Sequence, residues 1–207
     1  DFSAHIDAHY YDDLNHRPDI TQANIRYAPL PIKGYRLRMR LGMMYPSMSL
    51  ENTRTGWLSN SSYTNSAINT WIGEEVRSNG LEFSLTRPGR RFRSPWTYTI
   101  IGAAFKGNDP AGSMLAWRGW GLHDRQTGLN ERLPLANYPG LDGPILSKQT
   151  RQLNLFEEID GRWGTYFGAH VKYLSRFESR FYHYDSNAEP TAFNNGQWAW
   201  DTTFDHM

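Results

Sequence analysis

Arg36, Arg38 and Arg40 stand at alternate positions, and this spacing is the first pattern in the sequence that suggests chemistry. In an extended strand, residues two apart project from the same face about 6.6 Å from each other. Guanidinium groups at that spacing repel one another unless they face water, anions or carboxylates. The pattern therefore predicts either an anion-attracting pore wall or an ordinary solvated strand face.

Charged side chains from other strand-like segments are expected on the same side of the sheet as these arginines. The residues predicted to line an interior are Arg26, Arg36, Arg38, Arg40, Glu82, Lys172, Arg180 and Asp201. Asp7, Glu178 and Asp205 are expected there too, so the two signs of charge nearly balance. Because three arginines are consecutive on one strand face, the local field still predicts a modest preference for small anions or zwitterions.

The long segment Pro46–Arg77 contains two adjacent carboxylates. Ser66–Val76 has the composition of a short helix, and it carries Glu74 and Glu75. Adjacent helical residues do not share a face, so this pair is poorly placed for acid–base catalysis. If the segment folds inward, Glu74 or Glu75 would face the arginines across a constriction that also includes Arg77. The alternative is a solvated loop helix.

The remaining polar clusters do not predict a catalytic or metal centre. Glu157, Glu158 and Asp160 precede a strand-like run, where carboxylates serve glycoside hydrolysis, hold Ca²⁺ weakly or simply lie at a solvated loop end. His5 and His9 share a strand face, but no third metal ligand is evident. The sequence contains no G-x-S-x-G, H-E-x-x-H, G-x-x-x-x-G-K-[ST] or G-x-G-x-x-G motif. No catalytic residue, metal or cofactor is therefore expected.

Alternation with a period of two residues must place these side chains. In Tyr35–Tyr45 and Trp163–Tyr173, apolar and aromatic residues alternate with others over ten steps. Ten steps cover about 33 Å, or about 25 Å along the axis of a barrel whose strands tilt by about 40°, which is close to the apolar band of an outer-membrane barrel. The side chains predicted to face lipid are Tyr35, Leu37, Met39, Leu41, Tyr45, Trp163, Phe167, Val171 and Tyr173.

Eight segments carry this alternation, and the connections between them alternate in length. The candidate strands are residues 2–10, 22–27, 35–45, 81–86, 96–105, 162–173, 177–184 and 198–205. The short connections are Pro29–Gly34, Pro88–Ser94 and Leu174–Arg176, and the long ones are Asp12–Asp19, Pro46–Arg77, Gly107–Asp160 and Asn187–Gly196. Tight turns at one end and long loops at the other are typical of outer-membrane barrels. The sequence therefore predicts an all-β, antiparallel transmembrane β-barrel with long extracellular loops.

Composition narrows the classes of protein that remain. The 207 residues include 22 Lys and Arg and 21 Asp and Glu, so the formal charge is +1. This balance gives no excess of positive charge of the kind that binds nucleic acid. Cysteine is absent, which excludes thiolate metal sites and disulfide scaffolds. No apolar run approaches the roughly 18 residues of a membrane-spanning helix, but barrel strands give a much weaker signal. We interpret residues 1–207 as one barrel domain that is part of a longer barrel.

Two stretches resemble poorly characterised porin-like outer-membrane proteins of proteobacteria, which are related to the phosphate-selective and general porins. They are MMYPSMSLENTRTGWLSNSSYTNSAINTWIGEEVRSNGLEFSLTR and GAAFKGNDPAGSMLAWRGWGLHDRQTGLNERLPL. With the trailing GQWAWDTTFDH, the likeness covers most of the chain from Met43 on. The resemblance implies an outer-membrane β-barrel, and it brings neither a known substrate nor catalytic residues. A 16-stranded porin would need about twice the strands visible here.

Passive diffusion of small polar or anionic solutes through a water-filled barrel is the leading hypothesis. It implies a bacterial outer membrane, contact with lipid and no enzymatic activity, and it leaves a homo-oligomer open. One alternative is a secreted β-rich glycan-binding module, because Trp117 and Trp120 could stack on sugars. Another is an outer-membrane barrel enzyme that uses histidines and carboxylates. A soluble sandwich would show the same alternation, but connections as long as Gly107–Asp160 are uncommon in compact soluble domains.

Overall fold

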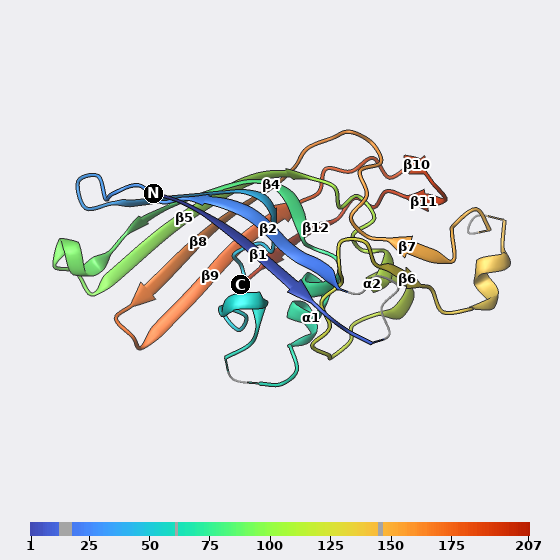
Figure 1. Ribbon diagram of the computed structural model, residues 1–207, viewed down its shortest axis with the longest axis horizontal. Coiled ribbons are helices and arrows are strands. Elements are labelled where there is room, and N and C mark those ends of the chain that lie inside the picture. Colours follow the sequence, from blue (N-terminus) through green and yellow to red (C-terminus); the bar gives the residue numbers. More distant parts are fainter. Residues whose placement is uncertain (13–17, 61, 145–146) are drawn as a thin grey trace.

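The computed structural model describes residues 1–12, 18–60, 62–144 and 147–207. Eight strands form one large antiparallel sheet in which successive strands pair (Figure 1). In spatial order they are β1 (Phe2–His9), β2 (Asp19–Tyr27), β3 (Arg36–Met44), β4 (Ser78–Arg87), β5 (Trp96–Lys106), β8 (Gly164–Tyr173), β9 (Phe177–Asp185) and β12 (Thr203–His206). Within the described residues β1 and β12 are the edges, and the sheet is not closed. The structure thus confirms a mostly-β antiparallel fold.

The last candidate strand, residues 198–205, is wrong in its first half. β11 (Gln197–Trp198) pairs with β10 (Phe193–Asn194) in a separate two-stranded sheet, and β12 begins only at Thr203. The backbone N–H of Trp200 donates to the carbonyl of Asp109 at 2.9 Å, which holds this stretch against a loop instead of the large sheet. Asp201 therefore lies outside any strand and is exposed, so its predicted place on an interior strand face is wrong.

The long connections leave the sheet at one end and the tight turns at the other, as predicted (Figure 1). Residues 45–77 and 107–163 form the long connections, while residues 28–35, 88–95 and 174–176 form the turns. The short elements between the sheet strands are η1 (Thr55–Trp57), α1 (Ala67–Glu74), η2 (Gly89–Phe92), α2 (Ser113–Arg118), β6 (Arg132–Pro134), η3 (Pro139–Asp142) and β7 (Gln152–Asn154). No helix in the described part of the chain is long and apolar enough to cross a membrane. Most of the predicted loop Asp12–Asp19 lies outside the described residues.

One face of the sheet, here called the inner face, is partly covered by the first long connection. Phe105 on β5 and Tyr166 and Tyr184 on neighbouring strands form a core with Trp71 and Ile72 of α1. These rings lie where the strands approach the long loops, and rings of Phe105 and Tyr184 stack 5.0 Å apart. Burial of such large aromatic side chains stabilises the loop on the sheet by several kcal/mol, at roughly 25 cal/mol per Å².

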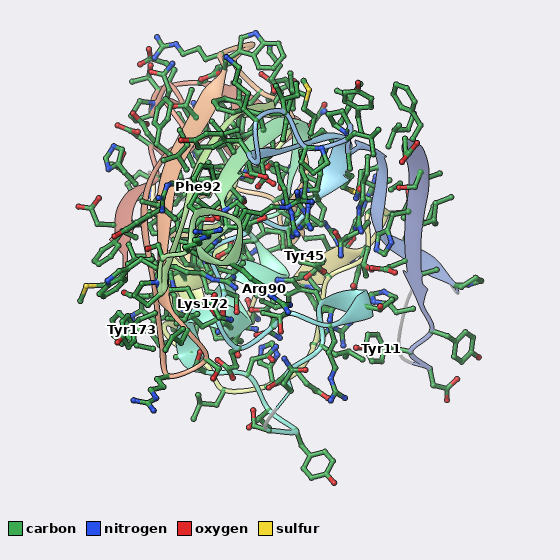
Figure 2. All side chains as sticks on the ribbon, turned by 90° about the vertical axis from the view of Figure 1, so that its left-hand side faces the viewer. Tyr11, Tyr45, Arg90, Phe92, Lys172 and Tyr173 are labelled. Carbon is green, nitrogen blue, oxygen red and sulfur yellow. The ribbon has the colours of Figure 1, made fainter. Side chains whose placement is uncertain are left out.

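Tyr45 belongs to this core, so its predicted place against lipid is wrong. β3 ends at Met44, and Pro46 has no N–H with which to continue the strand ladder. The chain turns to the inner side, where the ring of Tyr45 stacks on Trp57 at 4.7 Å. Seen along the sheet from the turn end, Tyr45 lies within the curve of the strands (Figure 2). Burial raises the pKa of the Tyr45 hydroxyl to about 12.

The opposite, outer face of the sheet is mostly apolar and exposed. Asp205 on β12 also lies on it, beside His183 of β9, so its predicted place in the interior is wrong. On it Leu41 lies opposite Leu81 and Met39 opposite Phe83. Leu41 and Phe167 are each 58% exposed, so nothing in the described chain packs over them. The predicted lipid-facing residues within strands on this face are Leu37, Met39, Leu41, Phe167, Val171 and Tyr173. Tyr35 and Trp163 are exposed just before β3 and β8 begin.

Candidate functional site: an arginine-lined cavity on the inner face

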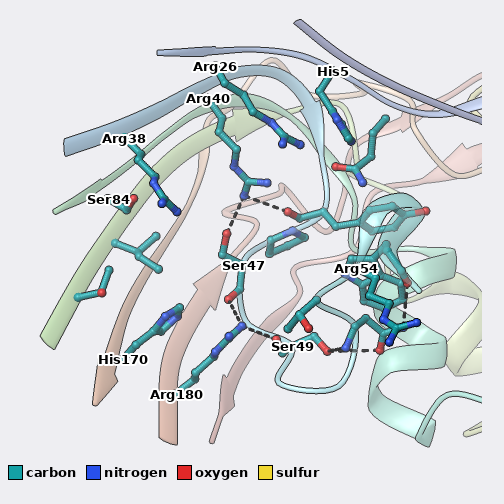
Figure 3. Close-up of a pocket in the computed structure, with 18 of the residues that line it drawn as sticks. His5, Arg26, Arg38, Arg40, Ser47, Ser49, Arg54, Ser84, His170 and Arg180 are labelled. Atoms are coloured by element: carbon teal, nitrogen blue, oxygen red, sulfur yellow. Dashed lines mark hydrogen bonds between the residues drawn. The ribbon is translucent and has the colours of Figure 1, made fainter. Parts of the chain in front are cut away.

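A cavity of about 480 Å³ opens on the inner face, beside the covered part of the sheet (Figure 3). We call it the arginine cavity. The basic side chains that line it are Arg26, Arg38, Arg40, Arg54 and Arg180, with His5 and His170. No carboxylate belongs to the lining among the described residues. Hydroxyl groups of serine and threonine side chains, including Ser84, Thr86 and Thr99, complete the wall.

Strand periodicity places three of these arginines. Arg38 and Arg40 are two apart on β3, so both project from the inner face. Arg26 on β2 lies directly opposite Arg40 in the strand register. Like charges directly opposite each other destabilise an antiparallel pair, so this arrangement needs a compensating carboxylate or water. Figure 3 shows all three guanidinium groups pointing into the cavity.

Glu82 on β4 supplies that compensation for Arg40. The Arg40 guanidinium binds both carboxylate oxygens of Glu82, with Nε 2.8 Å and Nη2 2.7 Å from them. The hydroxyl of Tyr166 donates to the same carboxylate at 2.6 Å. Glu82 is buried, so the charged pair is shielded from solvent. Arg40 is therefore a structural member of the wall, held by a bidentate ion pair.

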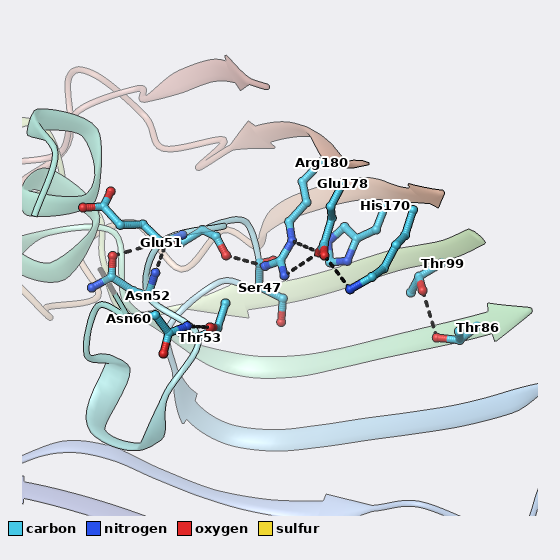
Figure 4. A network of polar contacts seen from close by, with 12 residues as sticks. Ser47, Glu51, Asn52, Thr53, Asn60, Thr86, Thr99, His170, Glu178 and Arg180 are labelled. Carbon is cyan, nitrogen blue, oxygen red and sulfur yellow. Dashed lines mark hydrogen bonds and ion pairs between the residues drawn. The ribbon is translucent and has the colours of Figure 1, made fainter. Parts of the chain in front are cut away.

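The segment that follows β3 folds across the inner face and is held on both sides. On one side Arg40 donates to the hydroxyl of Ser47 at 2.8 Å. On the other side Arg180 of β9 donates to the carbonyls of Ser47 and Ser49 (Figure 4). The hydroxyl of Tyr182 also donates to the Ser47 carbonyl, at 2.9 Å. Residues 46–49 therefore span the curve of the sheet and narrow the space beneath it. This is the inward fold that the sequence left open for Pro46–Arg77.

Glu178 neutralises part of the charge on β9. Its carboxylate binds Nη2 of Arg180 at 3.0 Å and Nζ of Lys172 at 3.1 Å. Lys172 is exposed and does not line the arginine cavity. Arg36, at the start of β3, is also exposed and outside it. Of the residues predicted to line an interior, Arg26, Arg38, Arg40 and Arg180 thus line this cavity, and Glu82 lies behind it.

The proposed facing of Glu74 and Glu75 toward the arginines is wrong. Arg118 binds both carboxylate oxygens of Glu74, and one of these oxygens lies 3.2 Å from Nε2 of His123. Burial alone would raise the pKa of Glu74, but His123 and Arg118 hold it below its ordinary value. Glu75 accepts hydrogen bonds from the backbone N–H groups of Met114 and Leu115 at the start of α2. Because Trp71 and Ile72 turn the apolar face of α1 toward the sheet, the carboxylates point to the second long connection instead.

Arg77 is fully buried and does not reach the arginine cavity. Its guanidinium lies 4.0 Å from the ring centroid of Phe156 and donates to the carbonyl of Thr21 at 2.7 Å. Burial lowers the pKa of Arg77 from its ordinary value. The residue therefore ties the base of the first long connection to β2 and to the second long connection, which is a structural role.

Two of the basic residues that line the cavity, Arg54 and His170, received no role from the sequence. Arg54 belongs to a long connection, where no periodicity predicts which way a side chain points. His170 shares its strand face with Lys172, so alternation could have placed it on the inner face. The Nε2 atom of His170 lies 2.7 Å from the hydroxyl of Tyr182, whose proton goes to Ser47. Nε2 must therefore donate, which fixes the tautomer of a neutral ring.

A second cluster of acidic groups lies near the long loops. Oxygens of Asp109, Glu158 and Asp160 lie within 4.8 Å of one another. One oxygen of Asp109 already accepts the backbone N–H of Ile159 and of Asp160, the latter at 3.1 Å. Glu157, which the sequence grouped with this cluster, binds Asn195 and Gln197 instead. These contacts give the carboxylates a role in ordering the loop.

Comparison with protein-family models, with curated proteins and with solved structures gives no match for this chain. The resemblance to porin-like proteins therefore remains a prediction.

Proposed function

We propose that this chain forms part of the wall of a β-barrel channel in a bacterial outer membrane. The channel lets small polar or anionic solutes diffuse passively, lipid surrounds the outer face, and the arginine cavity lies on the aqueous path. The proposal includes further strands that complete the barrel. β1 and β12 are the first and eighth strands of an antiparallel sheet, so they run in opposite directions, and added strands in even number can keep antiparallel order all the way round.

The observation that carries the proposal is the distribution of polarity across the sheet. A sheet in a water-soluble protein turns its apolar face to a core and its polar face to solvent. Here Leu41, Phe83 and Ile100 are exposed on the outer face, while charged side chains line a cavity on the inner face. Large contiguous apolar patches on a soluble protein mark a surface that something else covers. Lipid on the outer face satisfies both observations.

The charge of the cavity supports a preference for anions. Arg40 and Arg180 have carboxylate partners, in Glu82 and Glu178. In the described part of the chain, Arg26, Arg38 and Arg54 have none. At about 6 Å in water, one unit charge changes the energy of a passing ion by about 0.7 kcal/mol, or about threefold in occupancy. Unpaired guanidinium groups therefore favour anions over cations several-fold at low salt.

Reversal potentials across a planar bilayer test this proposal. The double variant Arg26→Gln with Arg38→Gln should lose most of the anion preference and keep the fold, because neither side chain binds a carboxylate. Arg40 is left unchanged, since its loss would leave the buried carboxylate of Glu82 without a positive partner. Arg90→Gln, on the exposed turn between β4 and β5, is the matched control. The preference should weaken with rising salt, because charges are screened over about 8–10 Å.

Two results would count against the proposal. Protein that remains in solution without detergent, and does not enter vesicles, would point to the secreted glycan-binding module instead. A channel whose anion-to-cation ratio is the same in the double variant and in the wild type would leave the barrel intact, but would show that the cavity does not set selectivity.

A further inference from the structure

A second cavity adjoins the arginine cavity. It measures about 550 Å³, and we call it the loop cavity. Arg54 and Trp57 line both cavities, so these two residues stand between them. The other residues of the loop cavity also lie in the two long connections. A solute that moves between the two cavities therefore passes Arg54 and Trp57.

The two cavities offer different chemistry. The loop cavity holds the carboxylate of Asp124 and the fully exposed phenol of Tyr63, together with serine and amide side chains. Asp124 accepts hydrogen bonds and repels anions. The arginine cavity holds the guanidinium groups of Arg26 and Arg38, which only donate and which have no carboxylate partner among the described residues; Arg26 donates to the side-chain amide of Asn24. Thr86 and Thr99 share one hydrogen bond at 2.9 Å, which leaves one hydroxyl proton and several lone pairs for a solute.

This combination selects against the simplest anions. An inorganic dianion gains from the guanidinium groups but is repelled by the carboxylate of Asp124 in the adjoining loop cavity. A neutral sugar satisfies Asp124, Tyr63 and the threonine hydroxyls but makes no use of Arg38. A solute with one carboxylate and several hydroxyl groups satisfies both cavities, because its hydroxyls donate to Asp124 and its carboxylate binds a guanidinium fork. Each cavity lies within the range of roughly 300–1,000 Å³ of small-molecule sites.

We infer that the paired cavities bind hydroxylated monocarboxylates, of which sugar acids are the type, as the solute of the proposed channel. Arg54 binds the solute as it passes from one cavity to the other, since this residue is exposed and lines both cavities. The inference rests on the proposed function for the direction of passage. Binding itself rests only on the two cavities, and it can be measured without a membrane.

Calorimetric titration of the folded protein in detergent tests the inference, with D-glucuronate, D-glucose and inorganic phosphate as the three probes. Glucuronate should bind at least about tenfold more tightly than glucose or phosphate, because one charge-assisted hydrogen bond contributes about tenfold. Arg54→Gln should weaken glucuronate by about the same factor and leave glucose unchanged. Asp124→Asn should weaken glucuronate and strengthen phosphate. Arg90→Gln should change none of the three affinities.

The outcomes separate this inference from the proposed function. Equal affinity for glucuronate and glucose, or tighter binding of phosphate than of glucuronate, overturns the inference. Conductance in a bilayer without saturable binding of glucuronate also overturns it, while the proposed channel stands. Tight glucuronate binding that depends on Arg54, in a protein that conducts no ions, would support the paired site and contradict the proposed channel.

Discussion

Glu75 is the buried carboxylate whose charge state should control how the two long connections are held together. It is fully buried, and it follows directly on α1. The backbone N–H groups of Met114 and Leu115 donate to it at 2.8 and 3.1 Å, as does that of Gly112 at 3.2 Å. The indole of Trp71 donates at 2.8 Å. In the described chain no cation binds it, so the carboxylate depends on these four neutral donors.

Burial raises the pKa of Glu75 to about 7, against an ordinary value of 4.5, and the neighbouring charge of Glu74 adds to the rise. The donated hydrogen bonds oppose this shift without cancelling it. A group whose pKa is raised in the folded state contributes stability that is fully present below pH 4.5 and is lost as the pH rises through 7. The difference of about 2.5 units corresponds to about 3 kcal/mol lost between these limits.

Glu75→Gln should remove this pH dependence, because the amide cannot ionise. Wild type should lose about 2.5 kcal/mol of unfolding free energy relative to the Gln variant between pH 5 and pH 8, since a small part of the loss already occurs below pH 5. The Gln variant should be the weaker protein at pH 5, since its amide nitrogen faces an N–H donor, at a cost of about 1–3 kcal/mol. Urea unfolding in detergent at several pH values measures both quantities. Glu189→Gln, which alters a surface ion pair with Arg162, is the matched control.

Parallel pH profiles of wild type and Glu75→Gln would refute the reasoning. So would a wild type that gains stability from pH 5 to pH 8 relative to the variant. Either result would mean that the four donors outweigh burial and keep Glu75 ionised throughout. Hydrogen exchange at Gly112, Met114 and Leu115 localises the effect, because these amides should exchange faster at pH 8 than at pH 5 in the wild type only.

Two further predictions concern the outer face and the inward segment. Phe167→Arg should lower the unfolding free energy in lipid vesicles by about 2–4 kcal/mol if the outer face contacts lipid. The same change at a water-exposed site alters the unfolding free energy by no more than about 0.5 kcal/mol. A loss smaller than about 0.5 kcal/mol in vesicles would therefore contradict the barrel. Arg180→Lys should loosen the segment at Ser47 and raise single-channel conductance and hydrogen exchange there. Three guanidinium nitrogens of Arg180 now hold the Glu178 carboxylate and the carbonyls of Ser47 and Ser49, and a single, shorter-reaching ammonium cannot keep that geometry. Arg176→Lys, on an exposed turn, should change neither, and unaltered exchange at Ser47 in Arg180→Lys would show that the segment is held by other contacts.

Local alternation made much of this fold predictable. The period of two residues requires no information beyond neighbours in sequence, and it put Arg38 and Arg40 on one face and Leu37 and Leu41 on the other. Connection length then determined that the long loops share one end, because successive antiparallel strands reverse direction. The outer-face residues and four of the cavity-lining arginines follow from these two facts.

Tertiary contacts decided the rest, where side chains in loops meet partners far away in the sequence. Tyr45 continues the alternation of β3 in sequence but lies in the core, because the chain leaves the strand at Pro46 and the Tyr45 ring stacks on Trp57. Arg54 lines the cavity because the connection that carries it folds over the inner face, and no periodicity in the sequence predicts that fold. Local pattern fixes which face of a strand a side chain occupies. Packing across the sheet alone decides which loop reaches that face, since the energy that orders a loop comes from contacts distant in sequence.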